Sequence, residues 1–213
     1  MPPLSKTLAI VAALAMQVMP VAAEQISEVQ VRTHPSQGKV VQVVGASARL
    51  ISGPRGVFVN LATNGLKPGN VYTLLMAVMN NPGQCPVLPC TPKDVLKRSD
   101  IVGSDVAYAG GAIATDAGKV VFAHFQPIGL FRDGFFKNGL TRTDGIEIHL
   151  VLNDHGPLIE GRALEMLTTY RGGCSDKSIP GPMPATARAQ GKPGPNKCRM
   201  VQFAQFVPDK PAS

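Results

Sequence analysis

Short apolar stretches separated by turn sequences run through most of the chain. In residues 56–62 the apolar positions alternate and place Val57, Val59 and Leu61 on one face, whereas residues 70–79 are apolar on both faces. A strand with one apolar face covers a core on that side, and a strand with two apolar faces lies buried between two layers. The pattern therefore predicts a β protein in which residues 70–79 form a central strand.

The same criteria predict further strands along the chain, at residues 29–33, 39–44, 102–108, 119–126, 145–152, 163–170 and 199–207. Turn sequences such as Asn64-Gly65 and Pro68-Gly69 lie between them. Eight or nine short strands with such turns are typical of an antiparallel β-sandwich. We therefore predict an all-β, Ig-like or Greek-key sandwich with a long Pro/Gly-rich loop near the C-terminus. Residues 93–99 predict one helical turn, and residues 131–143 a surface loop.

One local motif indicates how the sandwich turns a corner. Residues 66–72 read Leu-Lys-Pro-Gly-Asn-Val-Tyr, which has the spacing of a tyrosine corner. In such a corner Pro68-Gly69 makes the turn, Leu66 covers the edge of the core, and the hydroxyl of Tyr72 bonds back to the turn backbone. The motif predicts a structural feature of the fold and assigns no chemistry.

The first 23 residues have the three parts of a secretory signal peptide. Lys6 supplies a positive charge, residues 8–18 are apolar apart from Gln17, and Val21-Ala22-Ala23 is a small-residue cleavage site. The apolar run is too short to span a membrane, which takes roughly 20 residues. We therefore expect residues 1–23 to be removed. Residues 24–213 would form a single domain that does not span a membrane and acts in the periplasm or outside the cell.

Export makes disulfides the expected state of the four cysteines. Cys85–Cys90 and Cys174–Cys198 are the favoured pairs, because each pair brackets a Pro-rich segment. Other pairings are open, and a four-thiolate zinc site fits the spacing poorly. The second pair would close a loop over residues 174–198.

Composition and charge exclude some classes of partner. Charged residues make up 16% of the chain and aromatic residues 5%, with no Trp, so nucleic-acid binding on stacked aromatics is not expected. The formal net charge is +7, which becomes +6 when Lys6 leaves with the signal. A moderate positive charge favours anionic surfaces and otherwise serves solubility.

Histidine and glutamate side chains offer a candidate metal site. In residues 145–152 the alternation puts Glu147 and His149 side by side on one face, and His155 follows in the next turn. His124 would join them if its strand lay next to this one. One carboxylate and two or three imidazoles can hold Zn or Cu. The alternative is that these histidines are structural and the chain carries no cofactor.

The segment between Cys174 and Cys198 is a second candidate site. It has one acidic residue, Asp176, and four basic ones: Lys177, Arg188, Lys192 and Lys197. A long basic loop suits an anion or a protein partner, or is simply a solvated excursion. The sequence has no G-x-S-x-G nucleophile motif and no phosphate loop, so enzymatic activity is not expected.

These observations predict a non-enzymatic binding or structural module of the bacterial envelope or extracellular space. Its partner would be a protein or an anionic glycan bound through loops. The alternative is a periplasmic metal-binding protein that uses His149, Glu147 and His155.

The chain also resembles a group of exported bacterial proteins of unassigned function. The resemblance is carried by LKPGNVYTLLMAVMNNPGQC, by IEIHLVLNDHGP, and by GGC followed later by CRMVQFAQF. Together these segments cover much of residues 64–206. The resemblance implies a secreted β-sandwich with paired cysteines, and it implies no catalytic residue.

Overall fold

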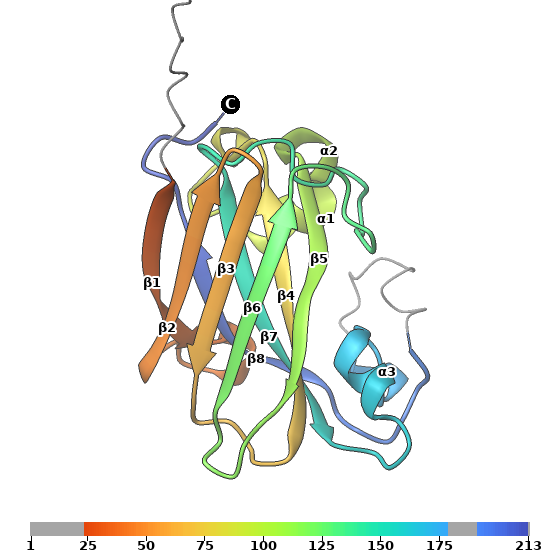
Figure 1. The fold of residues 1–213 in the computed structure, drawn as a ribbon. Coiled ribbons are helices and arrows are strands. Elements are labelled where there is room, and N and C mark those ends of the chain that lie inside the picture. Colours follow the sequence, from red (N-terminus) through yellow and green to blue (C-terminus); the bar gives the residue numbers. More distant parts are fainter. Residues whose placement is uncertain (1–23, 179–190, 213) are drawn as a thin grey trace, which may run out of the picture.

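The computed structural model describes residues 24–178 and 191–212, in which eight strands form one antiparallel sheet (Figure 1). The strands are β1 (Gln25–Thr33), β2 (Gln42–Gly53), β3 (Gly56–Thr63), β4 (Asn70–Met79), β5 (Ser104–Ile113), β6 (Val120–Pro127), β7 (Glu147–Pro157) and β8 (Arg199–Phe206). Their order in the sheet is β5-β4-β7-β8-β1-β2-β3-β6. The all-β antiparallel class is therefore confirmed. The predicted signal peptide and Arg188 lie outside the described residues.

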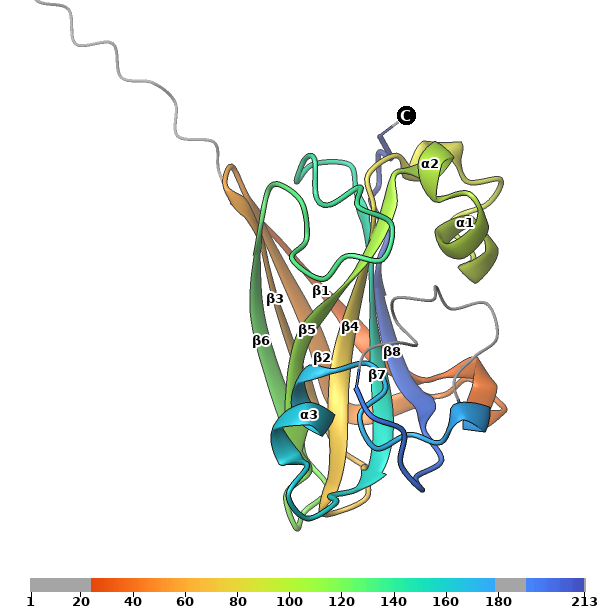
Figure 2. The ribbon, with the colours of Figure 1, turned by 90° about the vertical axis from the view of Figure 1, so that its right-hand side faces the viewer.

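The sheet curls until its two edge strands, β5 and β6, lie side by side. Figure 2 shows the result as two layers, β6-β3-β2-β1 facing β5-β4-β7-β8. Apolar side chains at alternate positions of both layers meet in the interior, among them Leu61 of β3, Leu74 of β4, Phe122 of β6 and Leu150 of β7. The alternating apolar residues in the sequence are therefore those that point into the core, and the residues between them lie on the outer face.

Strand β4 is buried along its whole length, as its two apolar faces predict. All ten of its residues are buried, and β5 and β7 pair with it along both edges, with one register shift in each ladder. Its inner side chains join the core, while Leu75, Ala77 and Met79 belong to a second apolar cluster on the outer face. That outer cluster is covered by helices and loops, which explains why β4 has no polar face.

Three short helices lie around this strand: α1 (Pro92–Lys97), α2 (Ser99–Val102) and α3 (Ala163–Thr168). Helix α1 confirms the predicted helical turn, and a capping box between Thr91 and Asp94 starts it. Short 3-10 turns occur at Pro35–Gln37, Pro82–Gln84 and Asp176–Ser178. None of the helices in the described residues has the length and apolarity needed to cross a membrane.

The strand predicted at residues 163–170 is wrong, because this segment begins with helix α3. Ala163, Leu164, Glu165 and Met166 are strong helix formers with no β-branched residue among them. Met166 is fully buried, whereas Leu164 is 76% exposed, so the apolar positions do not mark one face of a strand. For this segment, the helix propensity of its residues predicts the structure better than the alternation of its apolar positions does.

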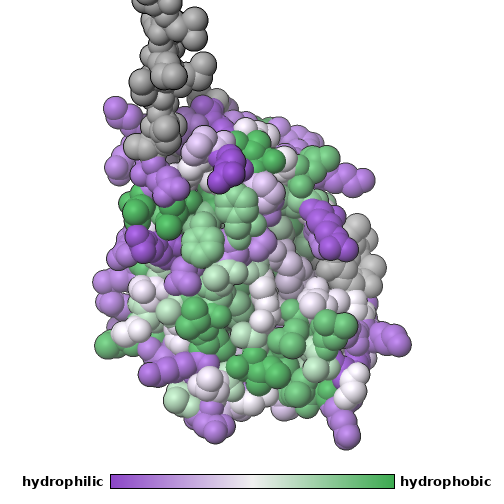
Figure 3. Space-filling model, in the orientation of Figure 1, coloured by the Kyte–Doolittle hydropathy of each residue, from purple (hydrophilic) through white to green (hydrophobic). Residues whose placement is uncertain are grey.

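The front face of the molecule carries scattered apolar side chains rather than one large patch. Figure 3 shows green and purple residues intermixed across β2, β3 and β6. Val121 and Phe125 of β6 and Leu164 of α3 are all more than half exposed. Isolated exposed apolar residues are common on protein surfaces and indicate no specific site.

The tyrosine corner and both disulfides form as predicted. The backbone N–H of Lys67 donates to the hydroxyl of Tyr72 at 3.0 Å, and Gly69 has a φ of 73°, which the turn requires. Disulfides join Cys85 to Cys90 and Cys174 to Cys198. Burial and the carboxylate of Asp154 raise the pKa of Tyr72 to about 12.

Replacement of Tyr72 by Phe tests this corner. The Lys67 N–H loses its acceptor, so we expect a cost of about 1 kcal/mol in unfolding free energy at pH 8. The unfolded tyrosine ionises near pH 10, whereas the folded one holds its proton to about pH 12. As the pH rises from 10 to 12, ionisation of Tyr72 therefore favours the unfolded state, and the unmutated protein loses stability. The phenylalanine variant has no group to ionise at this position and does not show this loss. By urea unfolding, the unmutated protein should lose about 1.4 kcal/mol relative to Tyr72→Phe from pH 8 to pH 11, so that the variant becomes slightly the more stable of the two at pH 11. If the difference in unfolding free energy between the two proteins were the same at pH 8 and pH 11, the raised pKa of Tyr72 would be contradicted.

Candidate functional site

The outer face of β7 carries the predicted pair Glu147 and His149. Ile148 and Leu150, which alternate with them, point into the core. Glu147 is fully buried beneath the Cys85–Cys90 segment. Its Oε1 accepts the backbone N–H of Cys90 at 2.8 Å and contacts Nε2 of His149. Glu147 and His149 are therefore in contact, as predicted, and the Cys85–Cys90 segment adds a backbone N–H to the pair.

His149 lies at the surface end of this arrangement. Its side chain is 12% exposed, and the side-chain nitrogen of Gln205 on β8 lies 3.2 Å from its Nε2. A carboxylate that faces one ring nitrogen sets the orientation of the imidazole and leaves the other nitrogen for a further partner. Glu147 Oε2 is buried and has no hydrogen-bond partner within the described residues. Glu147 is thus a buried carboxylate held by His149 and one backbone N–H.

Removing His149 should therefore destabilise the protein. In His149→Ala the buried carboxylate keeps only the Cys90 N–H, and we expect a loss of about 2 kcal/mol in the free energy of unfolding. Because the two side chains interact, the double variant Glu147→Gln with His149→Ala should lose less unfolding free energy than the sum of the losses in the two single variants. We expect the difference to be at least about 1 kcal/mol. Urea unfolding measures all three. His124→Ala is the matched control and should change stability by no more than about 0.5 kcal/mol. Additive costs at Glu147 and His149 would contradict the coupling.

The other two predicted ligands lie away from this pair. His155 is six residues beyond His149 on the same strand, which at the rise of a β-strand is about 20 Å. His124 lies on β6 opposite Val59, in the other layer, with its Nε2 3.3 Å from Gln126 Oε1. His149 and His155 lie on the same face of β7, but they are too far apart along the strand to bind one metal ion. Glu147, His149, His155 and His124 therefore form no common cluster.

His155 is instead part of a buried polar cluster at the opposite end of β7. Its Nδ1 lies 2.9 Å from the carbonyl oxygen of Gly172, and its Nε2 lies 2.8 Å from Oγ1 of Thr73 and 3.2 Å from the side-chain nitrogen of Asn153. A carbonyl oxygen only accepts, so Nδ1 carries the proton and Nε2 accepts. Burial lowers the pKa of His155. The imidazole is thus a neutral structural group in this state.

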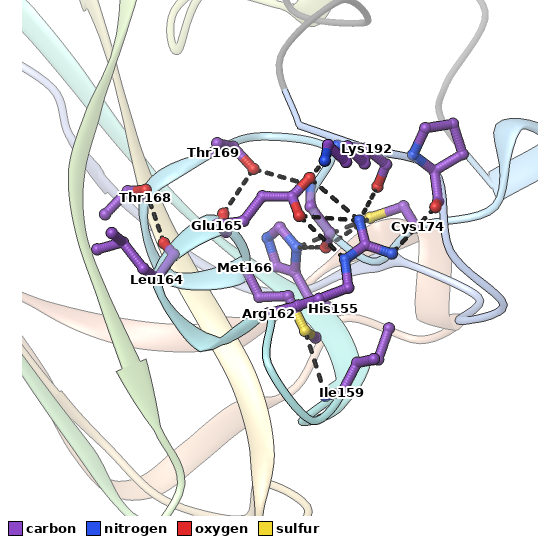
Figure 4. Close-up of polar contacts among 12 residues, drawn as sticks. His155, Ile159, Arg162, Leu164, Glu165, Met166, Thr168, Thr169, Cys174 and Lys192 are labelled. Atoms are coloured by element: carbon purple, nitrogen blue, oxygen red, sulfur yellow. Dashed lines mark hydrogen bonds and ion pairs between the residues drawn. The ribbon is translucent and has the colours of Figure 1, made fainter.

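The second disulfide adjoins this histidine. Cys174 Sγ lies 3.7 Å from His155 Nδ1 (Figure 4). Within residues 24–178 and 191–212, the side chains of His155, Cys174 and Cys198 are the one group of three or more whose metal-binding atoms converge, all within 4.8 Å of one another. Both sulfurs are bonded to each other in the structure. No sequence signal indicated this contact, because His155 and Cys174 are 19 residues apart.

The base of the basic loop is fixed by helix α3. Glu165 accepts the backbone N–H of Lys192 and pairs with Arg162, whose guanidinium also donates to the carbonyl oxygen of Pro193 at 3.1 Å (Figure 4). Burial alone would raise the pKa of Glu165, but these donors outweigh it and lower the pKa. Of the predicted basic residues, Lys177, Lys192 and Lys197 are exposed.

A cleft between β1 and β8 is the feature that the sequence did not predict. The two strands pair only through Arg32 with Phe203 and Thr33 with Gln202. From there they separate toward the end of the molecule where the C-terminus lies (Figures 1 and 2). Residues 25–30 of β1 pair with β2 on one side and have no strand partner on the other among the described residues. We call the opening the β1–β8 cleft.

The β1–β8 cleft has an inner and an outer part that share Val29 and Val207. The inner part has a volume of about 660 Å³ and reaches the core residues Leu50 and Phe206. The outer part, of about 330 Å³, is lined by the following residues: Gln30, Arg32, Pro89, Phe203, Ala204 and Gln205. Residues 207–212 pass along its open end, where the N–H of Ala212 donates to Gly145 O at 2.8 Å.

Comparison of the chain with protein-family models, with curated proteins and with solved structures finds no match. The resemblance to exported bacterial proteins therefore stays a prediction.

Proposed function

We propose that this protein is a non-enzymatic binding module that holds an extended segment of a partner polypeptide in the β1–β8 cleft. The observation that carries the proposal is the incomplete pairing of these two strands. They are neighbours in the sheet, yet only two residue pairs join them, although β1 has nine residues and β8 has eight. Every other neighbouring pair in the sheet has at least seven residue pairs.

The backbone on both sides of the cleft supports this proposal. A strand edge presents an N–H and a C=O at every second residue, and an unpaired edge is a template for another strand. Here two such edges face each other. An inserted strand would be antiparallel to one and parallel to the other, because β1 and β8 are themselves antiparallel. Strand addition of this kind derives its affinity from main-chain hydrogen bonds.

The side chains of the cleft indicate which residues the partner segment would carry. Its inner part combines apolar Val29, Leu50 and Phe206 with polar residues such as Ser27 and Asp144. Its outer part combines Phe203 and Ala204 with Gln30 and Arg32. Successive side chains of a strand point to opposite faces. The favoured segment therefore alternates apolar residues with polar ones, and an acidic residue suits the position beside Arg32.

An oxidising compartment is the setting that we propose for this binding. The two disulfides of the chain are typical of proteins in the periplasm or outside the cell. The predicted signal peptide would deliver the chain there.

An anionic glycan bound at the basic loop is the competing hypothesis. Lys177, Lys192 and Lys197 are exposed and close in sequence to the Cys174–Cys198 disulfide. Binding through exposed lysines weakens steeply with added salt, whereas strand addition is only weakly salt-dependent. The ionic strength dependence of binding therefore separates the two hypotheses.

Selection from a random library of displayed ten-residue peptides tests the proposal. We expect enriched peptides to alternate apolar and polar residues and to bind with dissociation constants in the micromolar range, about −8 kcal/mol. In hydrogen exchange, a bound peptide should protect amides of residues 25–30 and 204–206.

Ser27→Arg places a long charged side chain on the inner wall of the cleft and should weaken peptide binding at least tenfold. Val121→Arg adds the same side chain on β6, at an exposed position outside the cleft, and should leave binding unchanged. Enriched peptides that protect other strands, or that bind Ser27→Arg equally well, would refute the proposal.

A further inference from the structure

The cluster of His155, Cys174 and Cys198 lies apart from the β1–β8 cleft and has no part in strand binding. All three side chains are buried, and their potential metal-binding atoms lie within 4.8 Å of one another. They come from different elements: His155 lies on β7, Cys174 follows α3, and Cys198 directly precedes β8. Three soft or borderline ligands that converge in a buried place form a donor set that suits Zn²⁺.

The cluster is held in position by its surroundings independently of the disulfide. The backbone N–H of Gly194 donates to Cys174 O at 2.8 Å, and the N–H of Ser175 donates to Asn196 O at 2.8 Å, so the two chain segments are paired next to the cysteines. His155 is fixed by Thr73 and Gly172. The three donors would therefore stay close together if the sulfur–sulfur bond were broken.

We propose that reduction of the Cys174–Cys198 disulfide converts this cluster into a Zn²⁺ site whose ligands are His155 Nδ1 and the two sulfurs. A dithiol reductant supplies two electrons and two protons, which break the S–S bond and give two thiols, while the reductant becomes a disulfide. Zn²⁺ then displaces both thiol protons to solvent and forms two Zn–S bonds. The proton of His155 moves from Nδ1 to Nε2, so Nδ1 gives up its hydrogen bond to the Gly172 carbonyl oxygen and binds the metal.

The distance between Cys174 Sγ and His155 Nδ1 fits these bonds, and the two sulfurs move apart once the bond between them is broken. With Zn–S and Zn–N bonds of about 2.3 and 2.0 Å, a tetrahedral ion holds its sulfur and nitrogen ligands roughly 3.5 Å apart. Cys174 Sγ and His155 Nδ1 are 3.7 Å apart in the disulfide form. Two thiolates and one Zn²⁺ also sum to zero net charge, so the complex leaves no unpaired charge in a buried place.

The partner of the other ring nitrogen fits as well. Histidines that bind a metal almost always donate their second N–H to a neighbouring acceptor, which fixes the orientation of the ring. Thr73 Oγ1 lies 2.8 Å from His155 Nε2 and can accept that hydrogen bond, because a hydroxyl both donates and accepts. Thr73 thus serves both states with the direction of the hydrogen bond reversed, and the Asn153 amide, whose nitrogen lies 3.2 Å from Nε2, would present its oxygen instead.

Zinc retention by the full-length mature protein tests the proposal in its reduced and oxidised forms. The protein is reduced with a dithiol, desalted without oxygen, mixed with Zn²⁺ and passed through gel filtration. We expect one equivalent of Zn²⁺ in the reduced protein and less than a tenth of an equivalent in the oxidised one. Co²⁺ in place of Zn²⁺ should give the thiolate-to-metal absorption of a sulfur-bound ion. Equal retention by both forms, or none by the reduced form, would overturn the proposal.

Two double variants assign the sulfurs. The variant Cys85→Ser with Cys90→Ser keeps the second pair and should retain Zn²⁺, whereas Cys174→Ser with Cys198→Ser should not. The opposite result would place the metal at the other cysteines. His155→Gln should weaken Zn²⁺ binding at least 100-fold, and His124→Gln, the matched histidine control on β6, should not change it.

Thr73→Val keeps every metal ligand and removes the hydroxyl that lies nearest to Nε2. It should weaken Zn²⁺ binding about tenfold. This variant also covers the case in which His155→Gln does not fold, which far-UV circular dichroism would reveal. Unchanged affinity in a folded His155→Gln would mean that the thiols bind Zn²⁺ without the histidine and would overturn the assignment. Unchanged affinity in Thr73→Val would overturn the role of Thr73 as the partner of Nε2.

Discussion

Burial of β4 on both faces is the constraint on which the rest of the structure depends. A strand with ten buried residues needs a neighbour on each edge and an apolar cover on each face. The edges are taken by β5 and β7, and the inner face by the opposite layer. The outer face is covered by residues of α1 and α2, by the Cys85–Cys90 disulfide and by Tyr170 after α3, which explains why these segments lie on this side of the molecule.

The junction of β1 with β8 is held by fewer apolar contacts than β4. The inner residues of β1 become more polar toward its start, from Val31 through Val29 to Ser27 and Gln25, so less apolar area draws this end onto the core. The partial separation of β1 from β8 follows from that gradient. Glu147, His149 and His155 of β7 also lie on the outer face. There the Cys85–Cys90 segment supplies the N–H that Glu147 accepts, and the segment after α3 supplies the carbonyl oxygen of Gly172 to His155.

Much of the fold could be predicted from the sequence because local patterns determined it. The double apolar face of residues 70–79, the tyrosine corner at Tyr72 and the pairing of nearby cysteines each follow from a short stretch of chain. Helix α3 was missed because its composition, and not its alternation, determined its structure. The metal hypothesis joined Glu147 to His149 correctly in space but overlooked that His155 lies about 20 Å farther along the strand. The cleft and the contact of His155 with Cys174 depend on how distant strands diverge or converge, which no local pattern encodes.

Native-state hydrogen exchange of the ligand-free protein tests the central claim, that β1 and β8 present unpaired edges, most directly. In residues 25–30, alternate amides pair with β2 and should be protected, whereas the amides that face the cleft should exchange at close to unprotected rates. The amides of β4, paired on both edges, should exchange only with global unfolding. Uniform protection of residues 25–30 at the level of β4 would show that the cleft is closed in solution and would contradict the account.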